Sequence, residues 1–150
     1  MKAPFPEIRV ATADELPEVE QFLAAAALTR EELAECARGG QLLVARADDG
    51  CLMGCVALEL FESDALVRSL AVTAGARGHG LGSALLPRAV DKARAAGARG
   101  AWLLTETGGP FFAARGWEAA DRAAAPPDVA GSVEFSRACP SSVPAMRRVL

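Results

Sequence analysis

The sequence predicts an α/β (α+β) domain with one mixed central sheet of six to seven strands flanked by about four helices, in the order βααβββαβαββ. Some stretches alternate apolar and polar residues, and others repeat apolar residues every three or four positions, so both strands and helices are expected. Three strands follow one another without a helix, which excludes a doubly wound sheet. The chain has 150 residues and 51% of them are hydrophobic. We therefore predict a single domain over residues 1–150 with its own core.

The first part of the chain is expected to form a strand and two helices. Residues 8–11 alternate like a short strand. Thr12 or Asp14 can cap a first helix, whose apolar stripe is Leu16, Val19, Phe22 and Leu23. A second helix is predicted to begin in capping-box fashion at 29–32 and to end at Gly39-Gly40.

The middle of the chain is expected to form a strand meander followed by a long helix. The predicted strands cover 42–46, 51–61 and 65–72, with turn residues between them. An amphipathic helix then runs from Leu81 to Ala96 and is closed by Gly97.

The last third of the chain is expected to form shorter elements. These are a strand at 101–105, a short helix at 110–115, a strand opened by Trp117, an irregular stretch at 123–130 and a closing strand at 144–150.

Composition excludes several classes of protein. The net charge of −3 argues against a nucleic-acid binder, which needs a surplus of Lys and Arg. No apolar stretch approaches the roughly 20 residues of a membrane-spanning helix, and the start has no signal-peptide core. We expect a cytoplasmic protein that binds neither nucleic acid nor membrane, with reduced cysteines.

No metal site is expected, because the sequence has one histidine and no C-x-x-C pair. The alternative kept open is a soft-ligand or metalloid site formed by Cys51, Cys55 and Cys139.

The sharpest local motif is Arg77-Gly78-His79-Gly80-Leu81-Gly82, which follows a strand and opens a helix. Its glycines allow a tight turn and leave backbone amides pointing at one spot, at the positive end of the helix dipole. Arg77 adds a positive charge. The P-loop lysine and the G-x-G-x-x-G spacing are both absent, so the motif predicts a phosphate or pyrophosphate site of another kind.

This motif, written Arg-x-x-Gly-x-Gly after a strand that ends Leu70-Ala71-Val72, resembles the acyl-CoA signature of the GNAT superfamily of N-acetyltransferases. The segment Phe111 to Glu118 resembles the second cofactor segment of that superfamily, usually Phe-Tyr-x-x-x-Gly-Phe. The element order is also similar, so the likeness covers essentially the whole chain. Stretches at 66–72, 104–107 and 134–146 resemble a bacterial subgroup that contains arsenic-resistance N-acetyltransferases and short glutamate N-acetyltransferases.

The resemblance implies acetyl-CoA as co-substrate and direct transfer to an amine. The pantetheine arm would pair with the strand at Leu70 and Val72, and an amide near Leu70 or Ala71 would face the thioester oxygen. The cofactor residues that it implies are Leu70, Ala71, Val72, Arg77, Gly78, His79, Gly80, Leu81, Gly82, Ser83, Phe112 and Arg115.

Catalysis needs a base, because an amine is mostly protonated near neutral pH. Among the carboxylates Glu59, Glu62, Glu106 and Glu134, we expect Glu59 or Glu106 to serve, directly or through water. The usual tyrosine acid falls at Phe112, and the sequence contains no tyrosine. Ser69, Cys139 or water could supply the proton instead, or the thiolate could leave unaided.

Acceptor binding is expected near the same strand. Arg68 and Ser69 should lie on alternate faces of it, so Arg68 could bind a substrate carboxylate or pair with Glu59. Thr105, Thr107 and Glu134 are further expected contacts. The implied acceptor is a small amino-acid-like amine, with glutamate or an arsenic-containing analogue as alternatives, and a homodimer is compatible with the family. A non-catalytic acyl-CoA-binding module is the alternative function.

Overall fold

The computed structural model describes residues 6–76, 78, 80–138, 140 and 142–150, with the side chains of residues 137 and 138 excepted. Its centre is a seven-stranded sheet in the order β1-β2-β3-β4-β5-β7-β6. Only β4 and β5 pair in parallel, so the sheet is mixed as predicted. The strands are β1 (Glu7–Val10), β2 (Leu42–Arg46), β3 (Leu52–Leu60), β4 (Asp64–Val72), β5 (Gly100–Leu104), β6 (Glu118–Ala120) and β7 (Ala145–Val149).

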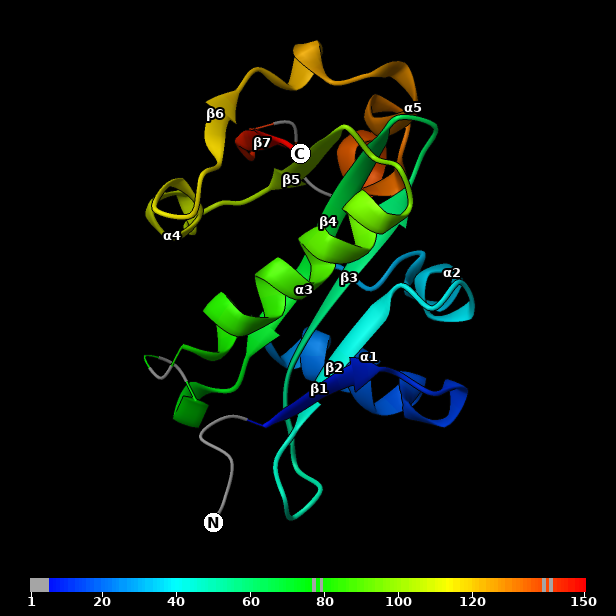
Figure 1. Cartoon of the computed structure of the whole chain (residues 1–150), viewed down its shortest axis with the longest axis vertical. Coiled ribbons are helices and arrows are strands. Elements are labelled where there is room, and N and C mark those ends of the chain that lie inside the picture. The colour runs from blue at the N-terminus through cyan, green and yellow to red at the C-terminus, as the bar shows by residue number, and fades with distance from the viewer. Residues whose placement is uncertain (1–5, 77, 79, 139, 141) are drawn as a thin grey trace.

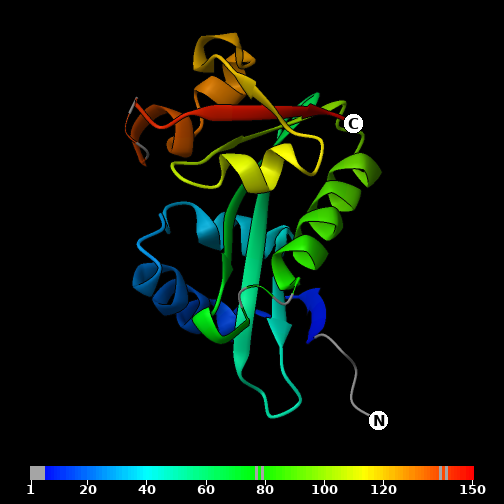
Figure 2. The ribbon, with the colours of Figure 1, turned by 90° about the vertical axis from the view of Figure 1, so that its left-hand side faces the viewer.

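Helices cover both faces of this sheet (Figures 1 and 2). α3 (Leu81–Ala95) packs on one face against apolar side chains of β2, β3 and β4. α1 (Leu16–Ala25) and α2 (Leu33–Arg38) pack on the other face. Consecutive residues of β2 therefore enter different cores, with Leu43 under α3 and Leu42 under α1 and α2.

The predicted order of long elements is confirmed, and the helix count differs. Besides α4 (Gly109–Ala113), the described residues include a fifth helix, α5 (Pro127–Ala130), inside the stretch predicted to be irregular. Pro127 stands in its first turn, where the fixed φ of proline favours a helix. Val129 is fully buried in a third apolar cluster with Trp102 and Phe135, which holds this turn in place.

A capping box forms at the first predicted helix start, where Thr12 or Asp14 was expected to cap, and not at the second. The Thr12 amide donates to Glu15 Oε1 at 2.9 Å, just before α1. The start predicted at 29–32 is wrong, because α2 begins at Leu33 and Glu32 has a left-handed φ of 65° with no side-chain capping bond. No helix among the described residues is long and apolar enough to cross a membrane.

Glu15 is expected to contribute to stability through an ion-pair network on β1 and β2. It accepts from Arg9 Nη1 at 2.6 Å and from Arg46 Nε at 2.7 Å, and these partners lower the pKa of its carboxyl to about 2. The resulting stabilisation is complete above the unfolded-state pKa and is lost as the pH falls toward 2. We expect Glu15→Gln to reduce the free energy of unfolding by about 2 kcal/mol at pH 7 and by almost nothing near pH 2.

Denaturant unfolding at several pH values measures this difference. Glu31→Gln is the control, because Glu31 is exposed. An equal effect of Glu15→Gln at both ends of the pH range would contradict the assignment.

Candidate active site

β4 and β5 run side by side at one end and part at the other. Their pairing covers only Asp64–Leu66 of β4 against Gly100–Trp102 of β5, while β4 continues to Val72. The space between them is a cleft of about 580 Å³. Residues from both strands, from the segment between α1 and α2, and from the starts of α3 and α4 line it. Beyond Leu66 no strand that the structure describes pairs with this edge of β4, so an extended ligand can lie along it.

A β-bulge at Ser69 shapes the wall of this cleft. Cys55 of β3 pairs with Ala71, but Ala57 pairs with Arg68, so β4 carries one extra residue at this point. Ser69 has a left-handed φ of 60°. The expected alternation of Arg68 and Ser69 is therefore wrong: both line the cleft, and Arg68 Nε donates to Ser69 Oγ at 3.2 Å.

The bulge also decides which amides face the cleft. The Thr73 amide donates to Met53 O of β3 at 2.8 Å, and the Ala71 amide interacts with the Cys55 thiol. Amides alternate in direction along a regular strand, so we expect that of Leu70 to point away from β3. Of the two oxyanion donors expected, Ala71 thus has its amide at Cys55, and Leu70 stays a prediction.

The glycine-rich loop places the start of α3, which has no side-chain cap, at the mouth of the cleft. Gly78 and Gly80 have φ values of 81° and 84°, which only glycine adopts readily. Gly80 precedes the first turn of α3 and provides no capping side chain, so the amides of that turn remain available to an anion. At Gly82, a Cβ would lie 3.3 Å from Phe111 Cζ. Arg77 and His79, the other loop residues expected to bind cofactor, lie outside the described residues.

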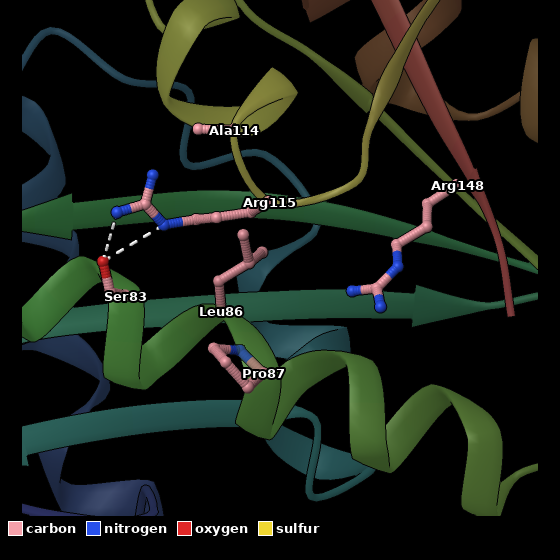
Figure 3. A pocket seen from close by; sticks show the side chains of 6 residues that line it. All are labelled: Ser83, Leu86, Pro87, Ala114, Arg115 and Arg148. Atoms are coloured by element: carbon pink, nitrogen blue, oxygen red, sulfur yellow. Dashed lines mark hydrogen bonds between the residues drawn. The ribbon is translucent and has the colours of Figure 1, made fainter.

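Arg115 brings a positive charge to this helix start from the end of α4 (Figure 3). Its Nε donates to Ser83 Oγ at 3.1 Å, and its Nη1 donates to Phe111 O at 2.7 Å. The guanidinium also lies 3.8 Å from the centre of the Phe111 ring. Phe112 lines the cleft, is buried, and packs against Trp117, so the position of the usual tyrosine carries no hydroxyl.

A charged cluster lies at the inner wall of the cleft. The Arg68 side chain is 1% exposed and pairs with Glu59 Oε2 at 3.1 Å and with Glu134 Oε1 at 3.4 Å. Thr29 Oγ1 donates to Glu134 Oε1 at 2.6 Å. Arg68 Nη2 is buried and has no hydrogen-bond partner among the described residues. A buried donor without a partner is costly, so this atom is suited to a ligand oxygen.

The carboxylates expected to act as base occupy different environments. Glu59 contacts Arg68 but does not line the cleft, and burial raises the pKa of its carboxyl. Glu134 lines the cleft and is held by Thr29 and Arg68. Glu106 lines the cleft and is exposed.

The threonines of this region also line the cleft. Thr105 Oγ1 accepts from the Gly108 amide at 2.8 Å and so holds the turn into α4, while Thr107 is exposed. Thr29 also lines the cleft, a role that its place in a predicted helix start did not indicate. Its contact with Glu134 spans 105 residues and so leaves no local pattern.

The described residues contain no group of three or more His, Cys, Asp or Glu side chains that could hold a metal ion. Cys55 is buried and Cys51 is exposed. Burial raises the pKa of the Cys55 thiol to about 12, which disfavours the thiolate that a soft metal ligand requires. Cys139, the third cysteine of the metalloid alternative, lies outside the described residues.

Comparison with known proteins gives one family and many similar folds. The model of the acetyltransferase (GNAT) family matches residues 6–116. N-acetylglutamate synthase from Neisseria gonorrhoeae, solved with coenzyme A and N-acetyl-glutamate, superposes with a TM-score of 0.81 at 25% identity over 99% of this chain and 36% of that one. Rv2747 from Mycobacterium tuberculosis, solved with CoA, superposes with a TM-score of 0.80 at 26% identity over 97% of this chain and 99% of that one.

An acetyltransferase from Staphylococcus aureus has a TM-score of 0.79 at 16% identity over 96% of this chain and 98% of that one, which shows a shared fold. The chain thus spans about a third of the length of the synthase and almost the full length of the other two structures. No curated protein matches the chain.

Proposed function

The chain belongs to the acetyltransferase (GNAT) family, and from this premise we propose that it moves the acetyl group of acetyl-CoA to the amine of a small, amino-acid-like acceptor that carries a carboxylate. The observation that carries the proposal is the buried Nη2 of Arg68 in the wall of the cleft, which has no hydrogen-bond partner among the residues that the structure describes. An arginine in a water-poor site binds a carboxylate strongly and in a defined orientation. Acyl transfer follows from the family, and the nature of the acceptor from Arg68.

The residues of the cleft fit coenzyme A. The edge of β4 that continues beyond its pairing with β5 suits the amide groups of a pantetheine arm, and the first turn of α3, which has no side-chain cap, suits a pyrophosphate. Gly82 allows α3 to lie close to Phe111, since a Cβ at this position would be 3.3 Å from Phe111 Cζ. Holding both substrates in one cleft supplies a large part of the rate enhancement.

In the proposed reaction the acceptor nitrogen forms a bond to the thioester carbon, the C–S bond breaks, and the thiolate leaves. The Leu70 amide donates to the oxygen as it becomes negative. A thiol with a pKa of about 8.5 leaves readily, so the absence of a hydroxyl at Phe112 is compatible with turnover. Ser69 Oγ, which accepts a hydrogen bond from Arg68 Nε, is the proposed donor of a proton to the leaving thiolate.

We propose Glu106 as the base that removes the proton of the amine. It lines the cleft and makes no ion pair with any residue that the structure describes, whereas Glu59 and Glu134 both hold Arg68. The role of Glu59 is then to position Arg68. Glu106→Gln is expected to lower kcat about 100-fold while the KM for acetyl-CoA changes little.

The control for this variant is Glu62→Gln, which changes an exposed carboxylate outside the cleft. If Glu59→Gln abolished the dependence of kcat on pH and Glu106→Gln preserved it, Glu59 would be the base instead.

Glutamate is the first acceptor to test, and an arsenic-containing amino-acid analogue is the second. One similar structure is that of a synthase complexed with N-acetyl-glutamate. The resemblance of residues 134–146 to the arsenic-resistance and short glutamate N-acetyltransferases supports both choices. Both acceptors carry a carboxylate for Arg68.

Two measurements test the proposal. Acetyl-CoA at millimolar concentration should raise the melting temperature, because a ligand that binds only the native state stabilises it. A thiol-release assay should then show turnover with amino acids and much less with the corresponding decarboxylated amines. Binding without thiol release for any amine would instead support a non-catalytic acyl-CoA module, and the lack of any thermal shift would contradict both functions.

A further inference from the structure

Arg122 does not line the cleft, yet its guanidinium binds three backbone carbonyls beside it. The residue begins the short 3-10 helix Arg122–Ala124, which follows β6. Its Nη1 donates to Pro140 O at 2.6 Å and to Val143 O at 3.1 Å, and its Nη2 donates to Phe135 O at 2.5 Å. One planar group with a permanent charge therefore connects three points of the chain that leads into β7.

These carbonyls belong to one wall of the cleft. Pro140 and Val143 line the cleft themselves. Phe135 directly follows Glu134, whose side chain belongs to the charged cluster of the same wall. Glu134 lies in a single turn of π-helix, Glu134–Ala138. A helix of one turn is not stable by itself, so contacts from outside must hold it in place.

Phe135 anchors this turn in two ways. Its ring is buried with Val129 and packs edge-on against Trp102, with 6.3 Å between the ring centres. Arg122 lies over the same ring, 5.4 Å from its centre, while it binds the Phe135 carbonyl. Burial of the ring fixes its place, and the bond to Arg122 fixes the direction of the backbone beside Glu134.

The position of Glu134 matters because one of its oxygens serves two partners. Oε1 accepts from Thr29 Oγ1 at 2.6 Å and pairs with Arg68 Nε at 3.4 Å. The second distance is already long for a charged pair, so a small displacement of Glu134 would release Arg68 Nε. The Arg68 guanidinium would then lose one of the contacts that direct its Nη2.

We propose that Arg122 is a positioning residue for the acceptor: it holds the turn that carries Glu134 against Arg68 and so keeps the carboxylate-binding guanidinium in place. This inference rests on the proposed function. Arg122→Met is expected to raise the KM for a carboxylate-bearing amine about tenfold, because a hydrogen bond from a charged donor contributes about that factor. The KM for acetyl-CoA and kcat should change less than about twofold.

Two further variants show whether the effect passes through Glu134. Arg122→Lys keeps a charged donor and should restore the KM to within about threefold of the parent. In the background of Glu134→Gln, Arg122→Met should raise the KM less than about twofold further, because the contact that it supports is already weakened. An unchanged KM in Arg122→Met, an equal rise for acetyl-CoA, or effects that multiply in the double variant would overturn the inference.

Arg88→Met is the matched control. Arg88 is an exposed arginine of α3 that also donates to a backbone carbonyl, Ile8 O at 3.3 Å, and it does not line the cleft. We expect this variant to keep both KM values of the parent. A tenfold rise of the acceptor KM in Arg88→Met would show that loss of any such arginine has this effect, and would overturn the assignment to Arg122.

Amide hydrogen exchange separates this inference from the proposed function. The amides of Phe135, Ser136 and Val143 are hydrogen-bonded, and in Arg122→Met they should exchange at least about tenfold faster while those of β2 do not change. If the parent acetylates no amine but exchange rises in this way, the proposed function is wrong and Arg122 still holds the turn. If exchange at these amides does not rise, the inference is overturned, whatever the turnover.

Discussion

Replacement of Gly80 by glutamate is expected to weaken acetyl-CoA binding at least about 100-fold and to abolish the thermal shift. Gly80 has a φ of 84° at the start of α3, where a side chain costs roughly 1–2 kcal/mol. The new carboxylate would also stand at the positive end of the helix, where it would occupy the anion site and repel the pyrophosphate. The strain lowers stability, whereas the blocked and repelled anion site lowers affinity; a binding loss of about 3 kcal/mol corresponds to about 100-fold, since each 1.4 kcal/mol is a factor of ten.

The chain contains a matched control at the other end of the same helix. Gly97 has a φ of 91° and open space around its Cα, so Gly97→Glu adds a similar strain and the same charge. It lies about 22 Å away, because α3 has 15 residues with a rise of 1.5 Å each. If Gly97→Glu weakened binding as much as Gly80→Glu did, the loss would come from stability and not from the anion site.

Replacement of Arg68 by methionine is expected to have the second large effect, on stability and on acceptor use together. Glu59 and Glu134 would remain near each other without their shared cation. Breaking a buried ion pair by removing one partner costs about 3–5 kcal/mol. That is a large part of the roughly 5–15 kcal/mol that stabilises a typical domain, so the melting temperature should fall markedly.

A second substitution is expected to restore much of the stability that Arg68→Met loses. In the variant Arg68→Met with Glu59→Gln, one of the two carboxylates that faced Arg68 becomes a neutral amide, and most of the lost stability should return. Chemical denaturation of the single and double variants measures this coupling. If the double variant were less stable than Arg68→Met, the cluster would not be held by charge pairing.

The effect on acceptor use is measured separately with Arg68→Lys, which keeps the positive charge but loses the Nη2 donor. We expect kcat/KM for a carboxylate-bearing amine to fall about 100-fold and that for its decarboxylated counterpart to change by less than about threefold. The thermal shift with acetyl-CoA should persist, since Arg68 is assigned to the acceptor. An equal loss for both amines would mean that Arg68 only maintains the shape of β4.

Local sequence patterns determined most of the architecture. Apolar periodicity predicted the order of the long strands and helices, because side chains alternate along a strand and recur every 3.6 residues along a helix. The glycines before Leu81 predicted a tight turn into a helix start without a side-chain cap, because a positive φ and a missing cap are properties of neighbouring residues. The absence of tyrosine, and thus of a hydroxyl at Phe112, also follows directly from the sequence.

Only the tertiary structure decided how the charged residues of the site meet. The bulge at Ser69 depends on the register between β3 and β4, and it turns Arg68 and Ser69 toward the same cleft. The partners of Arg68 come from β3 and from the segment before β7, and Thr29 joins them across 105 residues. Periodicity describes relations within one element, whereas these contacts follow from how distant elements pack, so no local pattern could predict them.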